Sequence, residues 1–203
     1  MTEINFVTQL LKPHLEAVNP ERLIVNAPRP GERFTYAVIR KFITNLLGSP
    51  AAQVVVTTMV DLFKLPRDFP GFADASALAP LERVRQLEQE CTRDVADRRF
   101  FAYLQLHEFE TLLLADLTVL AEQHPNRRKR ILELAVRLHK KFPSPEHVNR
   151  INPPSRRIKD IVPEYSKTVD GPITTAKIGL SKLRERCPHF GHWLERLEEL
   201  ARA

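Results

Sequence analysis

The run from Gln53 to Val60 limits most strongly what this chain can fold into. It reads Gln-Val-Val-Val-Thr-Thr-Met-Val, rich in β-branched residues and nearly continuous in apolar character. A strand with one face in water alternates apolar and polar residues, whereas a strand covered on both faces does not. A second apolar run extends from Phe100 to Leu106. We predict that both are buried strands of a mainly parallel sheet, and Leu23-Ile24-Val25 is a shorter strand candidate.

Segments with helical spacing of apolar residues separate the predicted strands. They predict helices at 3–18, 33–47, 79–98, 110–122 and 129–141, and shorter ones at 145–150, 155–161, 173–186 and 189–201. Pro13 lies inside the first helix and is expected to kink or end it. Strands alternating with helices indicate an α/β chain whose sheet is flanked by helices. We expect a single domain over residues 1–203, with an α/β core at 1–126 and a basic helical C-terminal appendage at 127–203 packed on it.

Length and composition exclude several classes of protein. The chain has 203 residues, of which 43% are hydrophobic and 28% charged, so it can bury a core of its own. No segment approaches the roughly 20 apolar residues that span a bilayer, so we expect no membrane association. The first residues lack the basic and apolar regions of a secretory signal. Cys91 and Cys187 form no paired motif, which favours reduced thiols in a cytoplasmic protein.

The net charge of +6 is concentrated in one stretch of the chain. Residues 1–126 carry a net −3, residues 127–160 a net +8 and residues 161–203 a net +1. Six basic residues lie in or beside the predicted helix at 129–141: Arg127, Arg128, Lys129, Arg130, Lys140 and Lys141. A local basic stripe is typical of a surface that binds a polyanion such as a nucleic acid. A solvated helix face, internal charge complementarity and docking to a partner protein are the alternative explanations.

Acidic residues come directly after two of the predicted strands. Asp61 follows the first buried run, and Glu108 and Glu110 follow the second. Ligands of open α/β sheets bind outside the carboxyl ends of the strands, so these carboxylates are candidates for a Mg²⁺ or Mn²⁺ site. Asp61 alone is equally explained as a residue that starts a turn. Glu108 and Glu110 point to opposite faces of an extended backbone, and we expect only one of them to face the site.

Four blocks of residues, taken in order, give the chain a resemblance to a known family. They are Val56–Asp61 with Leu65-Pro66 and Asp68–Gly71; Leu106–Glu110 with Leu112, Leu113 and Asp116; Pro154–Arg157 with Pro163 and Tyr165; and Ile178–Leu180 with Arg184, Cys187–Phe190 and Trp193-Leu194. Over essentially its whole length the chain resembles a family of small bacterial proteins of unknown function with a toprim-like fold. That family is a relative of the RloB proteins and of the toprim part of the OLD-family nucleases.

The resemblance implies an acidic metal site. The family usually reads Glu-Gly-x-Thr-Glu after its first strand, and Thr2 and Glu3 match the end of that motif. The strand and the first Glu of the motif have no counterpart here, so we expect the first strand of the fold to be missing. Asp61 matches an Asp-pair motif in which a Phe replaces the second Asp. Glu110, with Glu108 close by, matches the last acidic block.

The first hypothesis for the function is a metal-dependent, nuclease-like enzyme that acts on nucleic-acid phosphodiesters. Its metal ligands are expected to be Glu3, Asp61, Glu108 and Glu110. Its catalytic residues are expected to combine carboxylates with cations that contact phosphate or the transition state: Asp61, Glu110, Arg156, Arg157 and Lys159. A bound Mg²⁺ or Mn²⁺ polarises a phosphodiester and activates water. The basic stripe is expected to hold the nucleic-acid backbone beside the metal.

The second hypothesis is a non-catalytic interaction module. The absence of the first Glu and the single Asp are the sequence features that favour it. The resemblance implies a phage-defence or mobile-element setting, with an ATPase of the AAA or ABC type as the partner, for the enzyme and the module alike. A third and weaker hypothesis is a nucleic-acid binder without chemistry, whose affinity would fall steeply with salt and be indifferent to metal.

Overall fold

The structure is a computed structural model that describes residues 2–19, 35–48, 54–148 and 151–202. Its contacts divide the chain into two compact units. The strand unit is Arg29–Leu106, and the helical unit combines Met1–Pro28 with His107–Ala203. The helical unit thus joins the two ends of the chain, whereas our predicted boundary lay between residues 126 and 127. The single domain over residues 1–203 stays a prediction.

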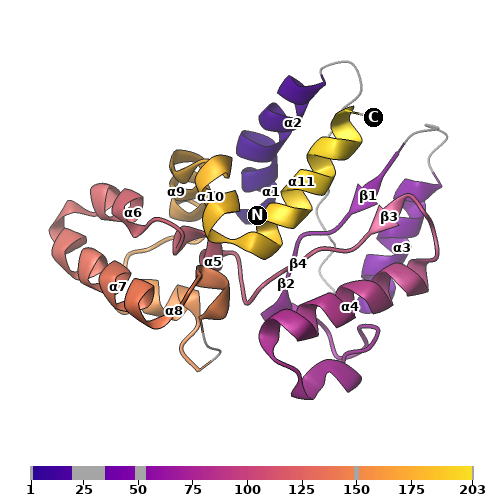
Figure 1. Ribbon diagram of the computed structural model, residues 1–203, viewed down its shortest axis with the longest axis horizontal. Helices are drawn as coiled ribbons and strands as arrows, with labels where there is room; N and C mark the ends of the chain where they lie inside the picture. Colours follow the sequence, from indigo (N-terminus) through magenta and orange to yellow (C-terminus); the bar gives the residue numbers. More distant parts are fainter. Residues whose placement is uncertain (1, 20–34, 49–53, 149–150, 203) are drawn as a thin grey trace. The chain divides into compact units, whose positions relative to one another are not determined.

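All the strands of the described residues belong to the strand unit, where they pair in parallel. Strand β1 (Val56–Thr57) pairs with β3 (Phe100–Phe101), and β2 (Val60–Asp61) pairs with β4 (Leu104–Gln105). Helices α3 (Tyr36–Leu47) and α4 (Pro80–Val95) flank these strands (Figure 1). The core between strands and helices is apolar and includes Ile39, Ile43, Val84, Leu87, Phe100 and Leu104. The predicted mixed α/β class, with parallel strands flanked by helices, is therefore confirmed.

Each long predicted strand is interrupted in the middle, and a side chain takes over the hydrogen bonding there. Thr58 follows β1, and its hydroxyl accepts the N–H of Tyr103 and donates to the carbonyl of Tyr103, each over 2.9 Å. A threonine hydroxyl that bonds backbone groups competes with the regular ladder between strands. The expected continuous strands at 53–60 and 100–106 are thus two short pairs joined by a side-chain bridge. The candidate at Leu23-Ile24-Val25 lies outside the described residues.

The first predicted helix is present and continues past Pro13. Helix α1 (Thr2–Phe6) leads into a π-helix at Val7–Leu11 and then into α2 (Lys12–Val18), with Pro13 in the first turn of α2. Proline cannot donate a hydrogen bond to the preceding turn, and π-turns occur mostly as single wider turns inside α-helices. The helix therefore does not end at Pro13, where we expected a kink or an end, and a wider turn directly precedes this residue.

The rest of the helical unit consists of helices and short turns. The helices are α5 (Glu110–Leu113), α6 (Leu117–Gln123), α7 (Arg128–Lys141), α8 (Pro154–Lys159), α9 (Asp170–Ile178), α10 (Leu180–Arg186) and α11 (Pro188–Arg202). Helices α2 and α11 lie side by side although they come from opposite ends of the chain (Figure 1). In the core, the rings of Phe109 and Phe190 pack edge-on against Phe6, with centroids 5.6 and 6.0 Å away.

Local chemistry divides the long predicted helices of this unit into shorter ones. The expected helix at 110–122 breaks before α6, where the carboxylate of Asp116 accepts the N–H of Thr118 and starts a new helix. The expected helix at 173–186 breaks at Gly179, whose φ of 79° lies in the left-handed region. Among the described residues, no helix is both long enough and apolar enough to cross a membrane.

The Thr58 bridge predicts a loss of stability when its hydroxyl is removed. Thr58→Val keeps the shape of the side chain but deletes both hydrogen bonds to Tyr103, and we expect the free energy of unfolding to fall by about 1–3 kcal/mol. Urea denaturation of the full chain measures this change. Thr44→Val on α3 is the matched control, because its exposed hydroxyl bonds only carbonyls of its own helix. Equal stability of the two variants would contradict the bridging role.

Candidate functional site

A buried ion pair lies at the centre of the helical unit. Glu110 is the first residue of α5, and its side chain is fully buried. The ammonium Nζ of Lys167 lies 2.7 Å from Oε2 of Glu110, and the hydroxyl of Tyr165 donates to Oε1 over 3.4 Å. The Lys167 side chain is itself 28% exposed, so it connects the buried carboxylate to the surface. An acidic residue in the first turn of a helix is also favoured by the helix dipole.

Burial dominates the electrostatics of this carboxylate. It raises the pKa of Glu110 above its ordinary value, and the charge of Glu108 acts in the same direction, while Lys167 opposes both. Burial likewise raises the pKa of Tyr165, and the negative charge of Glu110 adds to that effect. Tyr165 is therefore a neutral hydrogen-bond donor to the carboxylate. The electrostatic effect of Glu108 on both groups places it close to the pair.

Glu108 connects this cluster to the third sequence block. One of its oxygens, Oε1, accepts the backbone N–H of Ser155 over 2.6 Å, in the first turn of α8. The N–H groups at the start of a helix have no partner within the helix, so a carboxylate from elsewhere satisfies one of them. Two blocks that are 47 positions apart in the sequence thus meet through one hydrogen bond. Glu110 is buried against Lys167, whereas Glu108 reaches α8. That only one of them faces a metal site stays a prediction.

The residue before Glu108 turns the chain sharply. His107 has a φ of 63° in the left-handed region and is fully buried. Its Nε2 lies 3.1 Å from the carbonyl oxygen of Glu146, and burial lowers the pKa of His107, which favours the neutral ring as the donor. Glu146 in turn accepts the N–H groups of His189 and Phe190 at the start of α11. His107 therefore holds the acidic block in place rather than facing a ligand.

Helix α1 also reaches this cluster. The hydroxyl of Thr2 donates to the carbonyl oxygen of Lys167 over 3.2 Å. A Cβ atom at Gly171 would lie 3.1 Å from Cγ2 of Thr2 and 3.3 Å from Oη of Tyr165, so a larger residue would have to displace these neighbours by a few tenths of an ångström. Glu3 is the next residue on α1 and is half-buried. The helical unit thus brings α1, which carries Glu3, next to the segment that carries Lys167.

Asp61 is the one predicted ligand that belongs to the strand unit. It ends β2, is 2% exposed, and its Oδ2 lies 2.8 Å from Nζ of Lys64 three residues later. The ion pair gives the buried carboxylate a counter-charge from its own turn, which matches the turn-starting interpretation of Asp61. The meeting of Asp61 with Glu3 and Glu110 at one metal stays a prediction.

The donor set can be compared with what a divalent cation requires. Within the described parts of the two units, no three His, Cys, Asp or Glu side chains come together in a way that could hold a metal ion. Glu108 and Glu110 nevertheless supply hard oxygen atoms of the kind that Mg²⁺ and Mn²⁺ prefer. Lys167 already neutralises Glu110, so a cation would have to compete with the ammonium group. A cation held by Glu108 and Glu110 stays a prediction.

The predicted phosphate contacts on α8 differ in exposure. Arg156 and Lys159 are exposed, whereas Arg157 is half-buried. The Nε of Arg157 donates to the carbonyl oxygen of Asn152 over 2.7 Å, and its guanidinium lies 5.9 Å from the centre of the Phe142 ring. Arg157 therefore has a structural role in this turn, and Arg156 and Lys159 are the residues of α8 available to a ligand.

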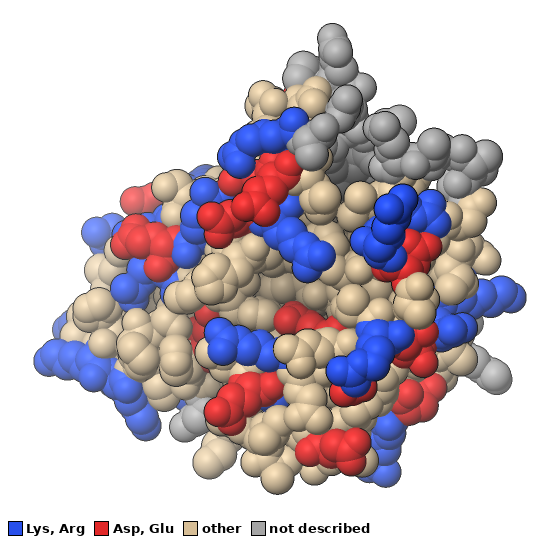
Figure 2. Space-filling view, turned by 45° about the vertical axis from the view of Figure 1, so that its right-hand side comes forward, with Lys and Arg blue, Asp and Glu red and all other residues tan. Residues whose placement is uncertain are grey.

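Most of the basic stripe is exposed along α7. Exposed positions include Arg128, Lys129, Arg130, Lys140 and Lys141. Arg127 lies 3.8 Å from the carboxylate of Glu164, and Arg130 donates to the carbonyl oxygen of Asp160 over 3.4 Å. Figure 2 shows Lys and Arg side chains interspersed with Asp and Glu side chains over the face that it presents. On that face the Lys and Arg side chains do not form one unbroken patch.

Sequence reasoning missed Lys167. It lies in none of the four blocks, although it comes two residues after Tyr165 of the third block. A lysine that neutralises a buried carboxylate 57 positions away cannot be distinguished in the sequence from a surface lysine.

Comparison with known proteins assigns the chain to a family over almost its whole length. A family model described as a domain of unknown function, DUF4276, matches residues 1–198. The chain belongs to the DUF4276 family. The predicted family of unknown function is thus confirmed, while a relationship of DUF4276 to RloB or toprim proteins stays a prediction. No curated protein and no solved structure matches the chain significantly.

The raised pKa of Glu110 predicts a specific pH dependence of stability. The folded chain binds the proton of the Glu110 carboxyl more tightly than the unfolded chain does. The stability that this proton contributes is therefore complete below the ordinary glutamate pKa, and it is lost as the pH rises through the pKa of Glu110 in the folded chain. Glu110→Gln mimics the protonated carboxyl at every pH. We expect the stability difference between variant and wild type to shift in favour of the variant as the pH rises from about 4 to 8.

Urea denaturation at a series of pH values measures this effect. Glu122→Gln on α6 is the control, because this glutamate is exposed. A stability difference between Glu110→Gln and wild type that stays constant across the pH range would show that Glu110 has an ordinary pKa.

Proposed function

We propose that this DUF4276 chain binds the phosphate backbone of a nucleic acid and, with a divalent cation held by Glu108 and Glu110, acts on phosphodiester bonds. The observation that carries the proposal is the hydrogen bond from the Ser155 N–H to Glu108. It holds the carboxylate of Glu108 at the start of α8, whose exposed cations Arg156 and Lys159 suit phosphate. A metal-dependent phosphodiesterase site requires carboxylates that hold the metal ion and basic side chains that hold the phosphate.

Each group of the chain has a distinct role in this proposal. Glu108 and Glu110 hold the cation, which when bound polarises the phosphodiester. Lys167 opposes the effect of burial on the pKa of Glu110 and gives its carboxylate a counter-charge. Arg156 and Lys159 neutralise the backbone phosphates, and the exposed cations of α7 extend this contact along the strand. Glu3 and Asp61 are further candidate ligands, and a toprim-like relationship to RloB and OLD-family nucleases is consistent with all these roles.

The proposal predicts metal-dependent nicking that requires Glu110. The full chain is incubated with supercoiled plasmid and Mn²⁺, and Glu110→Gln is expected to lower the nicking rate by about 100-fold or more, since loss of one transition-state contact costs this much. Mn²⁺ binding by calorimetry is expected to weaken in parallel. Glu122→Gln is the matched control and should nick like wild type. Undiminished nicking by Glu110→Gln would refute the metal role of Glu110, and the same result for Asp61→Ala would refute that of Asp61.

The phosphate contacts predict the salt dependence of nucleic-acid binding. The double variant Arg156→Gln/Lys159→Gln removes two proposed phosphate contacts, and the slope of log affinity against log salt should become shallower by about 2 for duplex DNA. Fluorescence anisotropy with a labelled duplex measures the slope. The charge-matched control Lys41→Gln/Arg85→Gln alters exposed residues of α3 and α4 and should leave the slope unchanged. Equal slopes for both doubles would remove α8 from the binding surface.

A second candidate function is the non-catalytic interaction module, and one observation favours it. Both buried carboxylates of the predicted site already have a lysine as counter-charge, Lys167 for Glu110 and Lys64 for Asp61. A chain that supplies its own cations keeps these acids for stability, with an ATPase of the AAA or ABC type as the proposed partner. Mn²⁺ calorimetry separates the two functions, because the module is expected to bind no Mn²⁺ at Glu108 and Glu110.

A further inference from the structure

The helical unit contains a pocket that shares only Lys140 with the basic stripe of the proposed function. The α7–α10 pocket, as we call it, has a volume of about 440 Å³ and is lined by α7, α10, the start of α6 and the turn at Pro145–His147. This volume lies in the range of about 300–1,000 Å³ that is typical of sites for small molecules. Its apolar lining includes Leu117, Ala135, Val136, Leu138 and Val148. It could therefore enclose the body of a small apolar molecule.

The charged groups of the pocket favour an anion. Lys140, Lys182 and Arg186 line it together with a single carboxylate, that of Asp116. This carboxylate is engaged at the start of α6, where it accepts the backbone N–H and the hydroxyl of Thr118. The pocket lining thus contains three basic side chains and one carboxylate, and that carboxylate already accepts two hydrogen bonds from Thr118. An anion in the pocket gains charge-assisted hydrogen bonds at little cost from repulsion.

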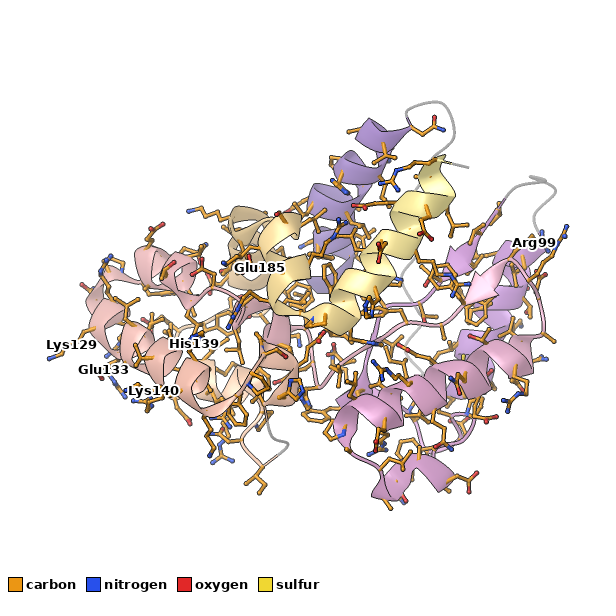
Figure 3. All side chains as sticks on the ribbon, in the orientation of Figure 1. Arg99, Lys129, Glu133, His139, Lys140 and Glu185 are labelled. Atoms are coloured by element: carbon orange, nitrogen blue, oxygen red, sulfur yellow. The ribbon has the colours of Figure 1, made fainter. Side chains whose placement is uncertain are left out.

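Two of the cations are available to a ligand. Lys182 pairs with Glu185 at 3.2 Å, and the side chains are 42% and 63% exposed, so this pair contributes little to stability and is easily exchanged. The guanidinium of Arg186 donates to Nδ1 of His139 over 3.3 Å. A neutral imidazole acceptor does not cancel the charge of the guanidinium. Figure 3 shows His139 and Lys140 toward one end of α7, Glu185 on α10, and Lys129 at the far end of α7.

The apolar lining is partly exposed to solvent. Val136 on α7 is 55% exposed although it lines the pocket. The apolar part of a ligand would remove this side chain from water, and each square ångström of apolar surface buried contributes about 25 cal/mol. A phosphate backbone has no group that would do so. We propose that the α7–α10 pocket binds a small organic anion, with its carboxylate or phosphate at Lys182 and Arg186 and its apolar body over Val136.

The test uses 8-anilinonaphthalene-1-sulfonate, an apolar aromatic anion whose fluorescence increases on binding. The full chain is titrated with this probe, and one site per chain is expected. Decanoate, which has both an apolar body and a carboxylate, should displace the probe. Inorganic phosphate at the same concentration has the charge without the body and should not. Several equivalent probe sites per chain, displacement by phosphate alone or displacement by an oligonucleotide would each overturn the proposal.

Charge-matched variants locate the site. Lys182→Gln/Arg186→Gln should weaken binding of the probe by about tenfold or more, since two charge-assisted hydrogen bonds are lost. Lys129→Gln/Arg137→Gln changes the net charge equally at residues that do not line the pocket and should bind like wild type. Val136→Glu, at an exposed position that tolerates a polar side chain, should abolish binding. Equal affinities of the two double variants, or full binding by Val136→Glu, would refute the site.

Discussion

The helical unit depends on the ion pair between Glu110 and Lys167. Removing the ammonium that neutralises this buried carboxylate would cost about 3–5 kcal/mol, so the segments that carry the two residues are held together strongly. Thr2 adds a third segment to the same point through its bond to the Lys167 carbonyl. One pair of charges therefore joins the beginning of the chain, α5 and the segment before α9, which are distant in sequence.

The same pair determines what the acidic block can do. Lys167 gives Glu110 a counter-charge from within the chain, and Glu108 reaches the N–H of Ser155 at the start of α8. A carboxylate placed for a bound metal and a carboxylate placed for an internal lysine have the same sequence signature. The two kinds of carboxylate differ in the cation that neutralises them, which is either a metal ion or the ammonium group of a lysine. For Glu110 it is the ammonium group of Lys167, whose side chain is 28% exposed.

Features that depend on local chemistry were predictable from the sequence. The apolar β-branched runs predicted parallel strands, and the helical periodicities predicted the helices, because both reflect neighbours within a few positions. The interruption at Thr58 was not predictable, since a threonine suits a continuous strand equally well until its hydroxyl meets Tyr103. Lys167 was missed for the same reason, because its meaning comes from a partner 57 positions away. The sequence thus draws attention to the acidic residues, whose role as a metal site stays a prediction, but not to the lysine that neutralises Glu110.

Counting charges along the sequence also overestimates a binding surface. The stretch 127–160 has a net charge of +8, but some of its cations are used within the chain. Arg157 bonds the carbonyl of Asn152, Arg127 lies near Glu164, and Arg130 reaches the carbonyl of Asp160. The carboxylate of Glu164 offsets the charge of Arg127, and the two carbonyl contacts hold the side chains of Arg157 and Arg130 in place. The exposed remainder lies on one long and one short helix, so any polyanion must be recognised by separate points of contact rather than by a continuous field.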